Sequence, residues 1–218
     1  FDESYDFAKM ASCIYVNLGT LTREQEQSIL MVCISAKNNN IPVVLDPVAC
    51  GAVPHKIALI EKLFEIGRVD IIKGNIGEIK SLAGYNAKTR GVDSIDNGDD
   101  SIDACISLAK KYKCIVAATG VKDIVTDGKR TALIENGSKM LTLITGAGCM
   151  VGALTAATAG VEDDKFIAAI TSILSMNIAA EHTEKEVIGP GSFKVKLIDN
   201  IYLLKENHLR KEGKIKWI

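Results

Sequence analysis

Short apolar runs alternate with helical patterns through most of this chain. The clearest runs are rich in Val, Ile, Leu and Ala, and they lie at residues 13–18, 42–46, 69–73 and 114–118. The segments between them place apolar residues at the spacing of an amphipathic helix. Near-continuous apolar strands that alternate with helices form a parallel sheet covered on both faces. We therefore predict a three-layer α/β fold, a mainly parallel sheet flanked by helices, as a single domain over residues 1–218.

The remaining patterns predict the other elements of this domain. Helices are expected at residues 2–11, 22–37, 55–66, 75–83, 101–112, 147–160, 163–184 and 192–205, the second of them opened by a capping box of Thr22 and Gln25. The turn at Asp127 and Gly128 predicts a hairpin between residues 123–127 and 129–135. Residues 140–144 predict a further buried strand. The polar residues 86–100 predict a surface loop, and the C-terminal residues predict an exposed basic tail.

The charge balance and the cysteines limit the classes of protein to which this chain can belong. With 26 basic and 27 acidic residues, the formal net charge is −1. Proteins that bind nucleic acid or an anionic membrane surface usually carry a basic patch or run. The six cysteines include no C-x-x-C pair, and the three histidines have no zinc-site spacing. We therefore expect a cytoplasmic protein with reduced thiols that binds neither nucleic acid nor a membrane.

A glycine-rich turn at residues 145–152, with the sequence TGAGCMVG, leads from the predicted strand 140–144 into a helix. Such a turn presents unpaired backbone N–H groups at the start of the helix, and the helix dipole adds positive potential there. We assign Gly146 and Gly148 to an anion site, most simply a phosphate site. Cys149 falls in the first turn of the helix, where the same potential favours a thiolate.

Three other interpretations compete for this stretch. Residues 141–161 are uncharged and long enough to cross a bilayer, but they are rich in Gly and Thr rather than Leu and Ile. The spacing G-x-G-x-x-x-G departs from the dinucleotide fingerprint G-x-G-x-x-G. Glycines also permit close packing of a helix, and for Gly152 and Gly160 this interpretation is preferred.

Polar residues stand at the ends of the predicted strands. Asp46 ends one strand, Lys73 ends the next with Glu78 one turn into the following helix, and Thr119 follows a third. The carboxyl ends of parallel strands form one ligand-binding edge. Two carboxylates beside a phosphate-binding helix suit a Mg²⁺-nucleotide. Structural roles remain open for each residue, because Asn75 and Glu78 also fit a helix capping pair.

Several segments in this order resemble the hydroxyethylthiazole kinase family, a thiamine-salvage family with the ribokinase-like fold. They are VVLDPV at 43–48, IKGN at 72–75 followed by Glu78, ATG at 118–120, TGAGCM at 145–150 and GPGSF at 189–193. The resemblance covers residues 8–204. Cys149 is its most specific point, since most ribokinase-like enzymes carry a catalytic aspartate there.

The resemblance implies ATP-dependent phosphorylation of the primary hydroxyl of 5-(2-hydroxyethyl)-4-methylthiazole, by a homotrimer with sites at its subunit interfaces. It also implies a role for each matched residue: Asp46 and Glu78 organise Mg²⁺; Lys73, Asn75, Thr119 and Gly120 contact ATP; Gly146 lies against the thiazole; Gly148 and Cys149 lie at the transferring phosphoryl group and the substrate hydroxyl. Other ribokinase-like small-molecule enzymes, and a nucleotide-binding protein without turnover, remain as alternatives.

The chain departs from the family in two places. Lys73 stands where the family usually has arginine, so it keeps the charge and loses the bidentate fork. Replacing Lys73 by alanine is expected to raise the KM for ATP. The family's N-terminal strand region, which also supplies thiazole contacts, has no counterpart before Phe1. We therefore expect either a fragment of a longer protein or a member with an incomplete substrate site, and in both cases an open sheet edge.

Overall fold

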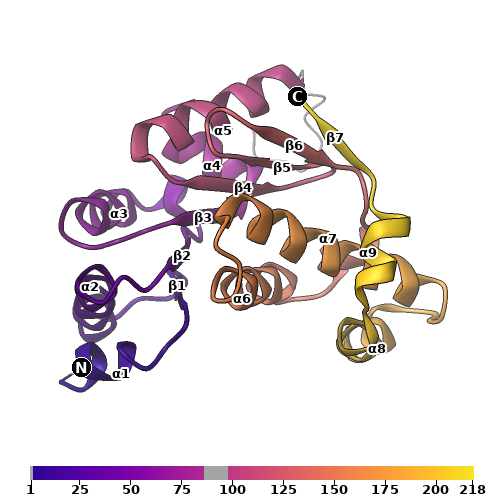
Figure 1. Ribbon diagram of the computed structural model, residues 1–218, viewed down its shortest axis with the longest axis horizontal. Coiled ribbons are helices and arrows are strands. Elements are labelled where there is room, and N and C mark those ends of the chain that lie inside the picture. Colours follow the sequence, from indigo (N-terminus) through magenta and orange to yellow (C-terminus); the bar gives the residue numbers. More distant parts are fainter. Residues whose placement is uncertain (1, 86–97) are drawn as a thin grey trace.

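A computed structural model describes residues 2–85 and 98–218, so most of the predicted loop 86–100 lies outside the described part of the chain. Within the described residues, seven strands form one sheet in chain order (Figure 1). The strands are β1 (Ile14–Asn17), β2 (Val43–Asp46), β3 (Ile71–Asn75), β4 (Ile115–Thr119), β5 (Asp123–Thr126), β6 (Thr131–Ile134) and β7 (Ile215–Trp217).

The sheet is mixed. Strands β1 to β4 pair in parallel, and β4 to β7 pair antiparallel, which gives three pairings of each kind. The prediction of a mainly parallel sheet is therefore correct only for the first four strands. The predicted hairpin is confirmed as β5 and β6. Strand β7, where an exposed tail was predicted, pairs with β6 and forms the other edge.

Helices cover both faces of the sheet, as predicted. Helices α2 (Arg23–Asn38), α3 (Pro54–Ile66), α4 (Ile76–Leu82) and α5 (Gly98–Tyr112) pack on one face, and α1 (Ser4–Ala8) packs on α2. Helices α6 (Ala147–Ala159), α7 (Lys165–Glu184), α8 (Pro190–Leu203) and α9 (Glu206–Glu212) lie on the other side (Figure 1). The predicted capping box of Thr22 and Gln25 is present at the start of α2.

The predicted strand 140–144 is wrong. These residues form a 3-10 helix, η2 (Lys139–Leu143), opened by Ser138, whose hydroxyl accepts a hydrogen bond from the Met140 N–H. Both edges of β6, the strand that precedes this run in the chain, are occupied by β5 and β7, so the run cannot pair with β6. The apolar side chains of Met140 and Leu141 instead pack against the core on the α7 side.

The period-two alternation of the strands decides which side chains meet. In β2, Val43 and Leu45 enter the core under α2 and α3, whereas Val44 enters the core under α6 and α7. Successive strand residues point to opposite faces. Residue 46 therefore shares the α6 face with Val44, and by the same rule residue 73 of β3 shares it with Ile71.

No helix in the described ranges combines the length and the apolar character that crossing a bilayer requires.

Candidate active site

The candidate site lies where β2, β3 and the start of α6 meet. Asp46 ends β2 and Lys73 lies within β3, both on the face that α6 covers. The Lys73 ammonium is 3.2 Å from Oδ2 of Asp46 and donates a 2.9 Å hydrogen bond to the Gly148 carbonyl. One buried lysine thus ties the sheet to the first turn of the glycine-rich helix. The structure brings together three of the residues predicted from the sequence.

Asp46 and Lys73 form an ion pair away from water. Each residue is 3 % exposed. Burial raises the pKa of the Asp46 carboxyl, and the positive charge of Lys73 opposes that rise. The cation offsets part of the free-energy cost of burying the carboxylate, and the carboxylate does the same for the cation. Either residue alone would therefore be costly to bury.

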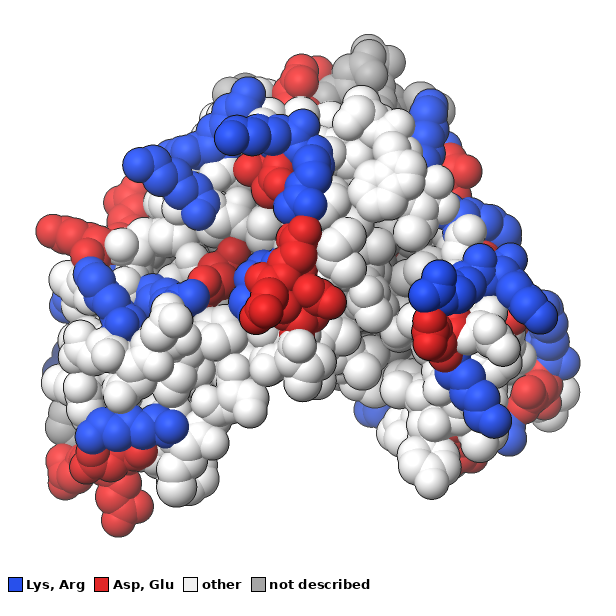
Figure 2. Space-filling view, viewed as in Figure 1, with Lys and Arg blue, Asp and Glu red and all other residues white. Residues whose placement is uncertain are grey.

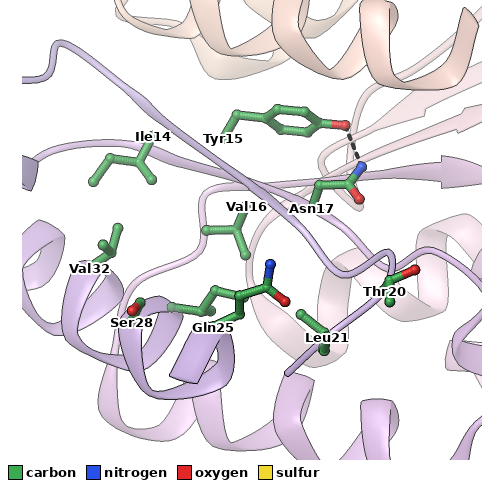
Figure 3. Close-up of a pocket in the computed structure, with 10 residues that line it drawn as sticks. Ile14, Tyr15, Val16, Asn17, Thr20, Leu21, Gln25, Ser28 and Val32 are labelled. Atoms are coloured by element: carbon green, nitrogen blue, oxygen red, sulfur yellow. Dashed lines mark hydrogen bonds between the residues drawn. The ribbon is translucent and has the colours of Figure 1, made fainter. Parts of the chain in front are cut away.

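Two residues of the edge strand β1 complete this cluster. The Tyr15 hydroxyl donates to Oδ2 of Asp46 over 2.9 Å, and Nδ2 of Asn17 donates to the Tyr15 oxygen over 2.9 Å. Nδ2 of Asn17 also lies 3.7 Å from Sγ of Cys149. Figure 3 shows Tyr15 and Asn17 on one side of β1, with Val16 on the other. Cys149 is exposed, whereas four of the other cysteines are buried and Cys13 is half-buried.

Sequence reasoning missed Tyr15 and Asn17. A signal was present, since positions 15 and 17 alternate with apolar Ile14 and Val16 and so predict one polar face on this strand. The parallel register then places Asn17 opposite Asp46. What could not be foreseen is that Tyr15 reaches across to the carboxylate.

Glu78 has a structural role at the start of α4. Its Oε2 accepts from the Asn75 N–H over 2.8 Å, and Oδ1 of Asn75 accepts from the Glu78 N–H, which completes a capping box. Its Oε1 accepts from the N–H of Ala49, in the loop after β2, over 3.0 Å. The capping role that the sequence left open is therefore present, and Glu78 also fixes the loop that follows Asp46.

The donor set of this edge fits Mg²⁺ only in part. Within the described ranges, no group of three or more His, Cys, Asp or Glu side chains is arranged to hold a metal ion. Two carboxylates, Asp46 and Glu78, flank the β2 loop, and each already accepts hydrogen bonds of the protein. Mg²⁺ bound mainly by phosphate oxygens and water requires one or two carboxylates. The pair suits such an ion, held largely through water.

Thr119 and Gly120 close the edge on the β4 side. Thr119 pairs with Asn75 in the sheet, and its hydroxyl donates to the Gly74 carbonyl. The Gly120 N–H donates to Oδ1 of Asp123, a carboxyl whose pKa burial raises to about 6. The predicted nucleotide contacts Asn75, Thr119 and Gly120 therefore form one continuous rim beside Lys73.

The glycine-rich turn begins α6 as predicted. Gly146 is its N-cap, with φ of 97°, a left-handed conformation that favours glycine, and a Cβ built there meets nothing within 4 Å. The first N–H groups of a helix have no partner inside the helix. The preferred interpretation of Gly152 as a packing glycine is confirmed, since it lies against the Tyr15 ring. Figure 2 shows the molecule hollowed on the side where α6 lies, with a mostly uncharged surface there.

The fold is shared with solved structures of low sequence identity. A pyridoxal kinase from Staphylococcus aureus matches it with a TM-score of 0.57 and 20 % identity, over 76 % of this chain and 60 % of that one. At this identity the likeness shows a shared fold.

A family model and individual relatives are more specific. The model described as the hydroxyethylthiazole kinase family matches residues 1–207. A hydroxyethylthiazole kinase of Clostridium novyi (strain NT) is 98 % identical over 218 residues, all of this chain and 82 % of that protein. The hydroxyethylthiazole kinase structure from Pyrococcus horikoshii OT3 matches with a TM-score of 0.89 and 32 % identity, over 100 % of this chain and 81 % of that one. The chain belongs to the hydroxyethylthiazole kinase family.

Proposed function

We propose that this chain transfers the γ-phosphoryl group of ATP to the primary hydroxyl of 5-(2-hydroxyethyl)-4-methylthiazole, in thiamine salvage. The observation that carries the proposal is the attachment of the α6 start to the Asp46–Lys73 pair through the Gly148 carbonyl. An anion-binding helix start, a cation and carboxylates then share one edge. Phosphoryl transfer requires mainly positioning and charge neutralisation, and these are the parts that supply both.

The residues divide between the two substrates in this proposal. Asn75, Thr119 and Gly120 line the nucleotide side, next to Lys73. Lys73 holds Asp46 and the Gly148 carbonyl and directs its remaining N–H toward the phosphates. Gly146 lies against the thiazole. The N–H groups of the first turn of α6, including those of Gly148 and Cys149, bind the oxygens of the transferring phosphoryl group.

Mg²⁺ would be held by ATP oxygens and water, with Asp46 and Glu78 as its protein partners. When bound, the ion neutralises charge on the phosphates. Glu78 supports this site independently of the ion, because it fixes the Ala49 N–H of the loop that follows Asp46.

Cys149 mainly positions the substrate hydroxyl in this scheme, because a loose transition state demands little proton abstraction. Cys149→Ser keeps a polar group at the same place. We expect kcat to fall by no more than about tenfold, about 1.4 kcal/mol of barrier, and the KM for the thiazole to rise. Steady-state kinetics would check this. Loss of turnover with unchanged thiazole affinity would show that positioning alone is inadequate.

Release of ADP from ATP and Mg²⁺, with and without the thiazole, tests the function. Stimulation by the thiazole is the expected result. Bound ATP without stimulated turnover would favour the alternative of a nucleotide-binding protein or of another substrate. Thiamine and a hydroxymethylpyrimidine are suitable control substrates, since neither should stimulate ADP release.

We also propose a cytoplasmic homotrimer with sites at its subunit interfaces. Exposed apolar side chains on α8, among them Val195, Ile198 and Tyr202, support a partner surface on that side. The six free cysteines fit a reducing compartment. Analytical ultracentrifugation should give the mass of a trimer, and a monomer at micromolar concentration would contradict the assembly.

A further inference from the structure

A line of hydrogen bonds runs from the buried ion pair to the exposed thiol. Asp46 accepts from the Tyr15 hydroxyl, Tyr15 accepts from Nδ2 of Asn17, and Nδ2 of Asn17 lies 3.7 Å from Sγ of Cys149. Three of these four residues come from two adjacent strands, and Cys149 comes from the first turn of α6. The line therefore joins the carboxylate on the proposed nucleotide side to the thiol on the proposed substrate side.

The direction of each hydrogen bond in this line is fixed. A phenol has one proton, and Tyr15 uses it on the Asp46 carboxylate, so its oxygen can only accept from Asn17. The Asn17 amide cannot turn over, because its Oδ1 accepts from the Gly19 N–H over 2.9 Å. Both N–H groups of that amide thus point away from Gly19, toward Tyr15 and Cys149. The sulfur of Cys149 is an acceptor in this arrangement.

The Tyr15 ring cannot easily leave its place. It packs against α6 at Gly152, where the missing Cβ leaves room for the ring, and Figure 3 shows it extending from β1 toward the helix layer above. Burial raises the pKa of the Tyr15 hydroxyl, so the phenol stays a proton donor. The line is therefore held by the packing of Tyr15 against Gly152 and, at its buried end, by the Asp46–Lys73 pair.

We propose that Tyr15 and Asn17 are positioning residues that hold the Cys149 side chain for the reaction. Because the sulfur accepts from Asn17 on the strand side, its own proton or free lone pair is left to face the substrate. The proposal rests on the proposed function only in placing the substrate hydroxyl beside Cys149. The positioning of the thiol itself is a property of the chain without any ligand.

Alkylation of Cys149 by iodoacetamide, followed by mass spectrometry of its peptide across pH 6–10, tests the positioning directly. Asn17→Ala removes the N–H that faces the sulfur, and Tyr15→Phe removes the hydroxyl but keeps the ring against Gly152. An N–H donor stabilises a thiolate, so both variants should move the midpoint of alkylation upward, by about 0.5–1 pH unit for Asn17→Ala and less for Tyr15→Phe. At pH 7.5 a smaller fraction of the thiol is ionised in the variants, which lowers the alkylation rate. The greater nucleophilicity of a more basic thiolate offsets part of this loss, so the rate should fall about threefold.

The midpoint separates this effect from simple access to the sulfur, which changes the plateau rate only. Ser28→Ala is the matched control, because Ser28 lines the same cavity of about 350 Å³ as Asn17 and donates to the Glu24 carbonyl of its own helix. The lysines that bind the backbone of the turn, Lys73 and Lys194, are unchanged in all variants.

Circular dichroism and thermal unfolding should first show that both variants are folded. Shifted midpoints in both variants, with a lower kcat and an unchanged KM for ATP, support the proposal. An unshifted midpoint in Asn17→Ala overturns it. A shift in Asn17→Ala without one in Tyr15→Phe overturns the part assigned to Tyr15. If both variants shift the alkylation midpoint but the wild type shows no thiazole kinase activity, the proposed function fails and the positioning of Cys149 by Tyr15 and Asn17 stands.

Discussion

Replacing Lys73 by methionine is expected to destabilise the fold by about 3–5 kcal/mol. Methionine fills a similar volume, so packing changes little. The Asp46 carboxylate, 3 % exposed, loses its only cationic partner among the described residues, and the Gly148 carbonyl loses a donor. Removing one member of a buried ion pair leaves an uncompensated charge, which is among the largest single-residue effects known. Urea unfolding of the wild type and the variant would measure it.

A double-mutant cycle separates the ion pair from the general loss of a side chain. Asp46→Asn combined with Lys73→Met removes both charges. The double variant should therefore lose less stability than the sum of the two single changes, by about 1 kcal/mol or more. Lys73→Arg keeps the positive charge beside Asp46 and should cost less than Lys73→Met. Additive effects in the cycle would show that the two side chains do not stabilise each other.

The cost of Lys73→Met should also depend on pH. Without the cation, the Tyr15 hydrogen bond is left to oppose the rise of the Asp46 pKa that burial causes, so the pKa rises further than in the wild type. The folded state then takes up a proton at a pH where the unfolded carboxyl, with a pKa of about 3.9, remains charged. Stability of the variant therefore rises relative to the wild type as pH falls from 7 toward 4. Urea midpoints measured at several pH values should show the two curves converging.

The strand pattern made the site predictable because of its regular period. Asp46 and Lys73 each lie two residues beyond a residue of the same sheet face, Val44 and Ile71, and neighbouring parallel strands bring such positions together. The four parallel strands and the helices between them follow from local patterns. The order of these four strands in the sheet follows if the connections between them are short and regular.

The errors have a common physical cause. Residues 140–144 have the composition of a strand, but whether a strand forms depends on a free sheet edge. The edge of β6 is taken by β7, whose residues come more than seventy positions later. Three-residue strands such as β7 carry too little periodicity to be recognised, and a partner so distant in sequence leaves no local signal.

Glu78 shows a different limit of sequence reasoning. The spacing of Asn75 and Glu78 fits a capping box, and the position of Glu78 after a strand also fits a metal site. The structure shows the capping box and adds the Ala49 contact, which no local pattern could give. A carboxylate with two partners of the protein retains lone pairs for water, so the two roles are compatible.

Gly152→Ala is expected to destabilise the protein by about 3 kcal/mol, the upper part of the range for overpacking. In an ordinary helix interior this change stabilises by about 0.5–1 kcal/mol, so the sign is reversed here. A Cβ at position 152 would lie 2.5 Å from Cε2 of Tyr15, and closer still to Cζ and the hydroxyl oxygen. The ring would have to move, and its hydrogen bonds with Asp46 and Asn17 would be lost.

The partner of the clash can be identified by a second change. Tyr15→Ala should reduce the cost of Gly152→Ala to below about 1 kcal/mol, because the added methyl then enters vacated space. Tyr15→Phe should give no such relief, since the ring carbons overlap with the Cβ as well as the oxygen does. Gly191→Ala in α8 serves as the control, because a Cβ there meets nothing within 4 Å, and it should be neutral or slightly stabilising. A neutral Gly152→Ala would mean that β1 and α6 approach each other less closely than the Tyr15 contact requires, and the line from Asp46 to Cys149 would then lose the packing that holds it.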